Sequence, residues 1–110
     1  MARLTIAKTD FLQRNLGGFK CVACVEARAG QAPKNLVDYD MSNVSNILSS
    51  ITHMRALGGK ESVTINSRPN GSDCLIIINV HSVSPDKKTW SEWVIFLSCD
   101  VDMHYKLLNV

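Results

Sequence analysis

Two apolar runs, CLIIINVHSV at residues 74–83 and WSEWVIFLSCDV at residues 90–101, stand on either side of the polar loop SPDKKT at residues 84–89. This arrangement is typical of an antiparallel β-hairpin. If the loop closes with Val83 opposite Trp90, every further pair along the two strands follows, because residues in an antiparallel ladder pair one to one. Alternate residues then point to opposite faces of the sheet.

Both faces of this hairpin are largely apolar. The first carries Ile76, Ile78, Ile95 and Leu97, and the second carries Leu75, Ile77, Val94 and Phe96. An uncovered apolar face usually marks an interaction surface, and at about 25 cal/mol per Å² four exposed side chains of this size forgo several kcal/mol. We therefore expect a second copy of the chain, or another protein, to bind the second face. The residues expected to line that interface are Leu75, Ile77, Trp90, Val94 and Phe96.

The rest of the chain supplies only one long helix to cover the sheet. Residues 42–57 repeat apolar side chains at helical spacing, and Gly58-Gly59 follows as a stop signal. Shorter elements are predicted at residues 9–16 (helix), 19–28 (strand), 36–39 (edge strand) and 61–67 (strand). The alternative to a bound partner is that the first short helix and the C-terminal tail close the second face within one copy.

These elements predict one domain over residues 1–110 with an α+β fold. An antiparallel sheet of four to five strands carries the main helix, residues ~42–57, on one face, in the order (α)β(β)αβββ. The turn Arg68-Pro69-Asn70-Gly71 predicts a second hairpin. A three-residue loop there would place Val63 and Ile65 with Leu75, whereas a four-residue loop, which we favour, would place them with Ile76.

The cysteines offer little chemistry in this arrangement. Cys21 and Cys24 have the spacing of a metal or redox pair, but in an alternating strand residues three apart point to opposite faces. Cys74 and Cys99 are expected to lie directly opposite each other. They are then either paired core thiols or, under oxidising conditions, a disulfide.

Asp100, Asp102 and His104 would share one side of the last strand if it continued past Cys99. Two carboxylates and an imidazole suit a divalent metal ion, but the polar side of a terminal strand explains them equally. The sequence contains no Ser/His/Asp order, glycine-rich phosphate loop or paired-carboxylate cleft. We therefore expect no enzymatic activity and no cofactor.

The net charge of +2 is too small to indicate a polyanion partner by itself. The alternative function is a small nucleic-acid-binding protein that uses Trp90 and loop basic residues. Those basic residues are Lys60, Arg68, Lys87 and Lys88. The N-terminus lacks an apolar segment of signal-peptide length, and no apolar run approaches the roughly 20 residues that span a bilayer. We expect a cytoplasmic protein that does not bind membranes.

From Val37 to Asp102 the pattern of elements resembles the second half of a DNA sliding-clamp domain. The order α-β-β-α-β-β-β is also similar to that of the roadblock and longin class of dimerising scaffold modules. No functional residue carries over from either resemblance. The sequence favours a non-enzymatic binding or scaffold module that forms a homodimer or docks onto a larger protein.

Overall fold

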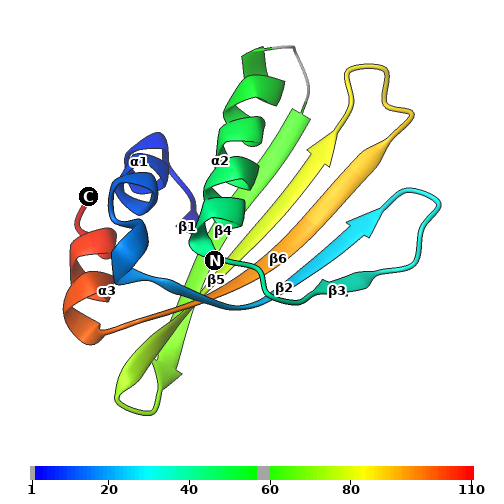
Figure 1. The fold of residues 1–110 in the computed structure, drawn as a ribbon. Helices are drawn as coiled ribbons and strands as arrows, with labels where there is room; N and C mark the ends of the chain where they lie inside the picture. The colour runs from blue at the N-terminus through cyan, green and yellow to red at the C-terminus, as the bar shows by residue number, and fades with distance from the viewer. Residues whose placement is uncertain (1, 57–59) are drawn as a thin grey trace.

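The structure of the chain is a computed structural model that describes residues 2–56 and 60–110. One antiparallel sheet with the strand order β1-β4-β5-β6-β2-β3 carries three α-helices, as Figure 1 shows. The elements are β1 (Ala2–Arg3), α1 (Ile6–Arg14), a 3₁₀ turn (Leu16–Gly18), β2 (Lys20–Arg28), β3 (Lys34–Leu36), α2 (Met41–Ala56), β4 (Lys60–Asn70), β5 (Asp73–Val83), β6 (Trp90–Cys99) and α3 (Val101–Leu108). The predicted α+β class and antiparallel sheet with a helix on one face are confirmed. The two-residue strand β1 and the helix α3 were not predicted.

Strands β5 and β6 pair in the register derived from the sequence. Val83 lies opposite Trp90, Ile78 opposite Ile95, and the pairing continues without interruption to the opposite ends of both strands. Ile78 and Ile95 are completely buried. The two apolar runs therefore form the centre of the sheet, with β4 on one side and β2 on the other.

The β4–β5 hairpin has the predicted faces but a shorter loop. Ile65 lies opposite Ile78, so β4 places its apolar side chains on the face that we favoured. Asn70 pairs directly with Asp73, which leaves a turn of two residues. Gly71 in this turn has a φ of 66°, a left-handed conformation that glycine adopts without steric cost. A two-residue loop and a four-residue loop differ by an even number, so both give the same faces.

All three helices pack on one face of the sheet (Figure 1). Leu12 of α1, Leu48 of α2 and Leu107 of α3 are almost completely buried in a single core with Ile76 and Ile78. The first helix and the C-terminal segment do not cover the second face, which carries Leu75 and Ile77. Both pack beside α2 on the face that carries Ile76 and Ile78.

Helix α2 begins with reciprocal hydrogen bonds between Asp40 and Asn43. The Asn43 backbone N–H donates to Asp40 Oδ1, and the Asp40 N–H donates to Asn43 Oδ1, both at 3.0 Å. This capping arrangement satisfies free N–H groups at the helix start. The predicted stop at Gly58-Gly59 lies outside the described residues.

Helix α1 begins three residues earlier than predicted. The Thr5 hydroxyl accepts a hydrogen bond from the Lys8 N–H at 3.2 Å, so Thr5 is the N-cap of this helix. Strand β3 is also displaced towards the N-terminus relative to its predicted position. Asp38 has a φ of 55°, which is incompatible with an extended strand through residues 36–39.

Strand β6 ends at Cys99, although the sequence suggested an extension to Val101. Asp100 caps α3, because its Oδ1 accepts the Met103 N–H at 2.7 Å. The following apolar residues have helical spacing. Met103 packs against the core and Leu107 lies within it.

A β-bulge interrupts β2 between Cys21 and Ala23, where Val22 has no partner on β6. Cys21 lies opposite Leu97, and Cys24 lies opposite Ile95. Because Leu97 and Ile95 both face the helices, Cys21 and Cys24 share that face. The prediction that these two cysteines point to opposite faces is wrong, since the extra residue of the bulge shifts the alternation by one.

Candidate functional site

The side of the sheet opposite the helices, which we call the open face, brings together all five residues of the predicted interface. The register places Leu75 and Ile77 of β5 on this side, with Trp90, Val94 and Phe96 of β6. No α-helix in the part of the chain that the structure describes packs against it. The placement agrees with the interface hypothesis, while binding itself stays a prediction.

The apolar centre of the open face continues onto strand β2. Ala23 lies opposite Phe96, and Val25 lies opposite Val94, so the bulge brings these two residues onto this side. Ile77, Val94 and Phe96 are half-buried. Leu75 is only 8% exposed, yet it does not belong to the core beneath the helices. These side chains form a continuous apolar strip across the three strands β5, β6 and β2.

Trp90 closes one end of the open face. Its ring stacks on the imidazole of His81, with ring centroids 6.1 Å apart and an angle of 24° between the planes. Glu92 lies directly opposite His81 and is exposed. Together with Lys87, these three residues contribute to a shallow hollow of about 230 Å³. Trp90 itself remains 40% exposed, which leaves its ring available for contact.

The basic residues of the nucleic-acid alternative do not gather in one place. Arg68 lies opposite Leu75 at one end of the sheet, whereas Lys60 occupies the register position opposite Val83 at the other. Eight residues of extended strand separate these positions by about 26 Å. The side chain of Lys60 lies outside the described residues.

Lys87 and Lys88 directly follow a carboxylate, that of Asp86, in the β5–β6 loop. Asp86 accepts hydrogen bonds from the Ser84 hydroxyl and from the Lys88 N–H. These hydrogen bonds, the one from Ser84 above all, lower the pKa of the Asp86 carboxyl. The negative charge of Asp86 offsets part of the positive charge of the lysine pair.

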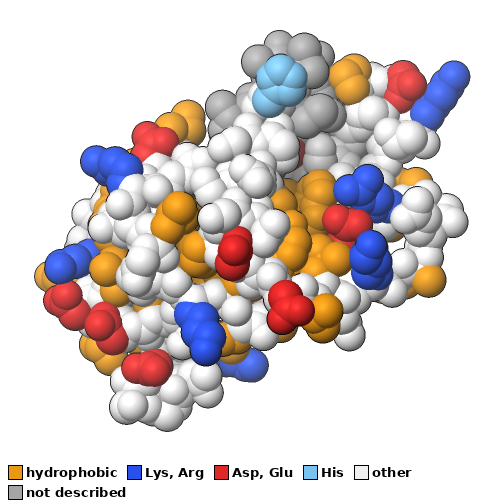
Figure 2. Space-filling view, viewed as in Figure 1, with side chains coloured by type: hydrophobic (Ala, Val, Ile, Leu, Met, Phe, Trp, Pro, Cys, Tyr) orange, Lys and Arg blue, Asp and Glu red, His pale blue; other side chains and the backbone are white. Residues whose placement is uncertain are grey.

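Among the described residues, the helix-covered side also shows charges of both signs. Figure 2 shows acidic and basic side chains interspersed over this side. A nucleic-acid footprint usually appears as a stripe of lysine and arginine.

The proposed metal ligands do not share one side of a strand. Asp100 is the N-cap of α3, Asp102 forms an ion pair with Lys106 at 3.0 Å, and His104 Nε2 lies 2.9 Å from the Ser67 hydroxyl. A helix turns about 100° per residue, so the i, i+2, i+4 pattern of a strand no longer aligns them. No group of three potential metal-binding side chains occurs within residues 2–56 and 60–110.

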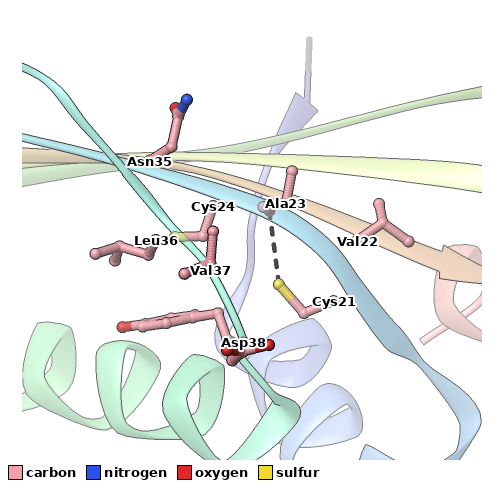
Figure 3. A pocket seen from close by; sticks show the side chains of 9 residues that line it. Cys21, Val22, Ala23, Cys24, Asn35, Leu36, Val37 and Asp38 are labelled. Carbon is pink, nitrogen blue, oxygen red and sulfur yellow. Dashed lines mark hydrogen bonds between the residues drawn. The ribbon is translucent and has the colours of Figure 1, made fainter.

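The four cysteines are free thiols. Cys74 lies opposite Cys99 as predicted, and both are buried. Cys21 and Cys24 border a hollow of about 580 Å³ with Leu36 and Tyr39, which Figure 3 shows from close by. Cys21 Sγ also lies 3.6 Å from the Ala23 carbonyl oxygen.

Burial raises the pKa of three of the thiols. It raises the pKa of Cys24 to about 12 and that of Cys99 to about 11, and Cys21 shifts in the same direction. At neutral pH these groups are therefore thiols, and the thiolate is the nucleophilic form. The arrangement does not favour thiol catalysis.

We expect Cys24 and Cys99 to resist alkylation at pH 8 in the folded protein. Their raised pKa values reduce the thiolate fraction, whereas the unfolded chain has thiols near their ordinary value of 9.0. Since folding favours the protonated thiols, their contribution to the free energy of unfolding is complete below pH 9 and is lost as the pH rises through about 11 for Cys99 and about 12 for Cys24.

Iodoacetamide labelling followed by peptide mass spectrometry, with urea-unfolded protein as the control, measures the resistance of the two thiols to alkylation. Equal labelling rates in folded and unfolded protein would contradict the expectation.

Comparison with protein-family models, curated proteins and solved structures finds no match to this chain. The resemblances to a sliding-clamp domain and to roadblock or longin modules thus gain no support from these comparisons. Among the described residues, no helix has the length and apolar character needed to cross a membrane.

Proposed function

We propose that this chain is a non-enzymatic binding module of the cytoplasm that forms a homodimer through its open face. The observation that carries the proposal is that α1, α2 and α3 all pack on the same side of the sheet. Leu75, Ile77, Val94 and Phe96 are left on the other side. The four free thiols are consistent with a reducing compartment.

The open face is large enough for a specific interface. Four strands about 4.8 Å apart and four rows of side chains about 6.8 Å apart cover roughly 500 Å². Two copies would then bury roughly 1,000 Å² in total, near the lower limit for specific protein interfaces. Two sheets that pack face to face in this way also resemble the two layers of a β-sandwich.

The composition of the open face fits a second copy of the same chain. Its centre is apolar and uncharged over Ile77, Val94 and Phe96, as in the core of an interface. Charged side chains, including Arg68 and Glu92, lie only towards the ends of the strands. A two-fold dimer uses the same patch on both copies, so one apolar strip serves both sides of the contact.

Substitution of Phe96 by lysine tests the proposal. We expect Phe96→Lys to raise the dimer dissociation constant by about 100-fold, because it places a charge at the centre of the contact. Sedimentation equilibrium of the wild type and the variant measures this change. Val94→Thr, which is close in shape to the wild type, should weaken the dimer less and guards against a variant that fails to fold.

Ile6→Lys is the matched control, since Ile6 is 70% exposed and belongs to helix α1 on the helix-covered side of the sheet. It should leave the dissociation constant unchanged. A wild-type chain that stays monomeric at its highest attainable concentration would overturn the homodimer. Salt-sensitive binding of a single-stranded oligonucleotide that is lost in a Lys87→Glu/Lys88→Glu variant would instead favour the nucleic-acid alternative.

A further inference from the structure

Two rows of the open face carry side chains of opposite charge. At one end, Lys20 and Arg68 flank Leu75 and Ser98 in a single row across the strands, which we call the Leu75 row. Towards the other end, Glu92 lies beside His81 and Ala27 in the His81 row. The side chains of Lys20, Arg68 and Glu92 are exposed.

Within residues 2–56 and 60–110, no ion pair involves Lys20, Arg68 or Glu92. Asp73 lies one row beyond Leu75, next to the β4–β5 turn, and reduces the positive charge of that end without reversing it. The Leu75 row therefore carries two basic side chains and the His81 row one acidic side chain, while Lys60, at the register position opposite Val83, and Lys87 are basic residues beyond the His81 row.

In the aligned packing of two stacked sheets, the strand directions stay nearly parallel, and a two-fold axis between the sheets then runs either along the strands or across them. An axis along the strands brings each row against the same row of the second copy. Lys20 and Arg68 of both copies would then meet at one end, where like charges repel. An axis across the strands reverses the order of the rows in the second copy relative to the first. The Leu75 row of one copy then meets the His81 row of the other, and opposite charges face each other.

We propose that two copies pack open face to open face about a two-fold axis that crosses the strands, with Lys20 of each copy beside Glu92 of the other. This inference rests on the homodimer proposed above and specifies its geometry. Strand β6 of one copy then lies over β6 of the other, which places Glu92 over the second copy's Ser98. Lys20 is adjacent to that position, because it pairs with Ser98 on the neighbouring strand β2.

Carbodiimide cross-linking tests the geometry directly. In one copy, three rows separate Lys20 from Glu92 by about 20 Å, which is too far for an amide bond to form between their side chains. In a mixture of ¹⁴N- and ¹⁵N-labelled protein, we expect Lys20–Glu92 cross-links that join light and heavy peptides. The ion pair of Lys106 with Asp102, at 3.0 Å, is the internal positive control and should cross-link within one copy.

Charge reversal gives a second, independent readout. Lys20→Glu and Glu92→Lys are each expected to raise the dimer dissociation constant about tenfold, and the double variant should return it to within about threefold of the wild type. Asp10→Lys on α1 is the matched control, since it reverses an exposed acidic residue on the helix-covered side. It should leave the dissociation constant unchanged.

The outcomes separate this geometry from the homodimer itself. A wild-type dimer that Phe96→Lys dissociates, but that shows neither the cross-link nor an effect of charge reversal, would overturn the geometry and leave the homodimer standing. A monomeric wild type would overturn both.

Discussion

Ile78→Ala is expected to lower the free energy of unfolding by about 2–5 kcal/mol, the usual cost of removing a large buried aliphatic side chain. Ile78 is completely buried at the centre of β5, between Ile65 of β4 and Ile95 of β6. Small domains have a total stability of only about 5–15 kcal/mol, so this loss is a substantial fraction. Urea denaturation followed by circular dichroism measures it.

Ile77→Ala is the matched control, because Ile77 is the neighbouring residue and points to the open face. Measured at low protein concentration, where association is negligible, it should destabilise the monomer distinctly less than Ile78→Ala. It should instead weaken dimer formation at high concentration. Equal destabilisation of the monomer by the two variants would contradict the assignment of the two faces.

Leu107→Ala is expected to cost a similar amount, about 2–5 kcal/mol. Leu107 lies in the last turn of α3, and its side chain is completely buried in the core that α1 and α2 share. The C-terminal helix would then be part of the cooperative unit of the fold. Thermal and urea unfolding of the variant test this expectation.

Leu108→Ala serves as its control, since the next residue in the chain is 51% exposed. Its effect should stay within about 0.5 kcal/mol, as for most surface substitutions. If Leu107→Ala were equally mild, α3 would contribute little to the core.

The central strands could be predicted because one constraint fixes them. Once Val83 and Trp90 are placed opposite each other, the pairing of β5 with β6 leaves no freedom, and it extends correctly to Cys74 and Cys99. The side-chain period of two then assigns each residue to a face. All five residues of the predicted interface were placed on one face by this argument.

The C-terminal helix was missed because the sequence around Asp100 fits two conformations. Asp102 and His104 continue the alternation of β6, yet Met103 and Leu107 also have the spacing of four residues that a helix requires. The decisive feature is the Asp100 carboxylate, which accepts the Met103 N–H and ends the strand. Aspartate is a common N-cap residue, because its carboxylate accepts a hydrogen bond from a backbone N–H in the first turn of the helix. Asp100 before an apolar helical pattern could therefore have indicated α3.

The bulge in β2 could not be foreseen from alternation alone. Residues 19–28 show the apolar-polar alternation of a regular strand. The extra residue becomes visible only in the pairing of β2 with β6. In the regular register, Cys24 would point to the open face. In the observed register it points to the helices, and its side chain is almost completely buried. Val22 stays without a partner on β6, and in return the shifted register places Cys24 in the core beneath the helices.

The edges of the sheet restrict how copies of this chain can assemble. The outermost strands β1 and β3 contain only two and three residues, and Pro33 directly precedes β3. Proline cannot donate a backbone hydrogen bond, and short edge strands offer few groups to an added strand. Addition of a strand to β1 or β3 themselves is therefore disfavoured. In the proposed homodimer, association through the open face would end after two copies, because each copy has one such face.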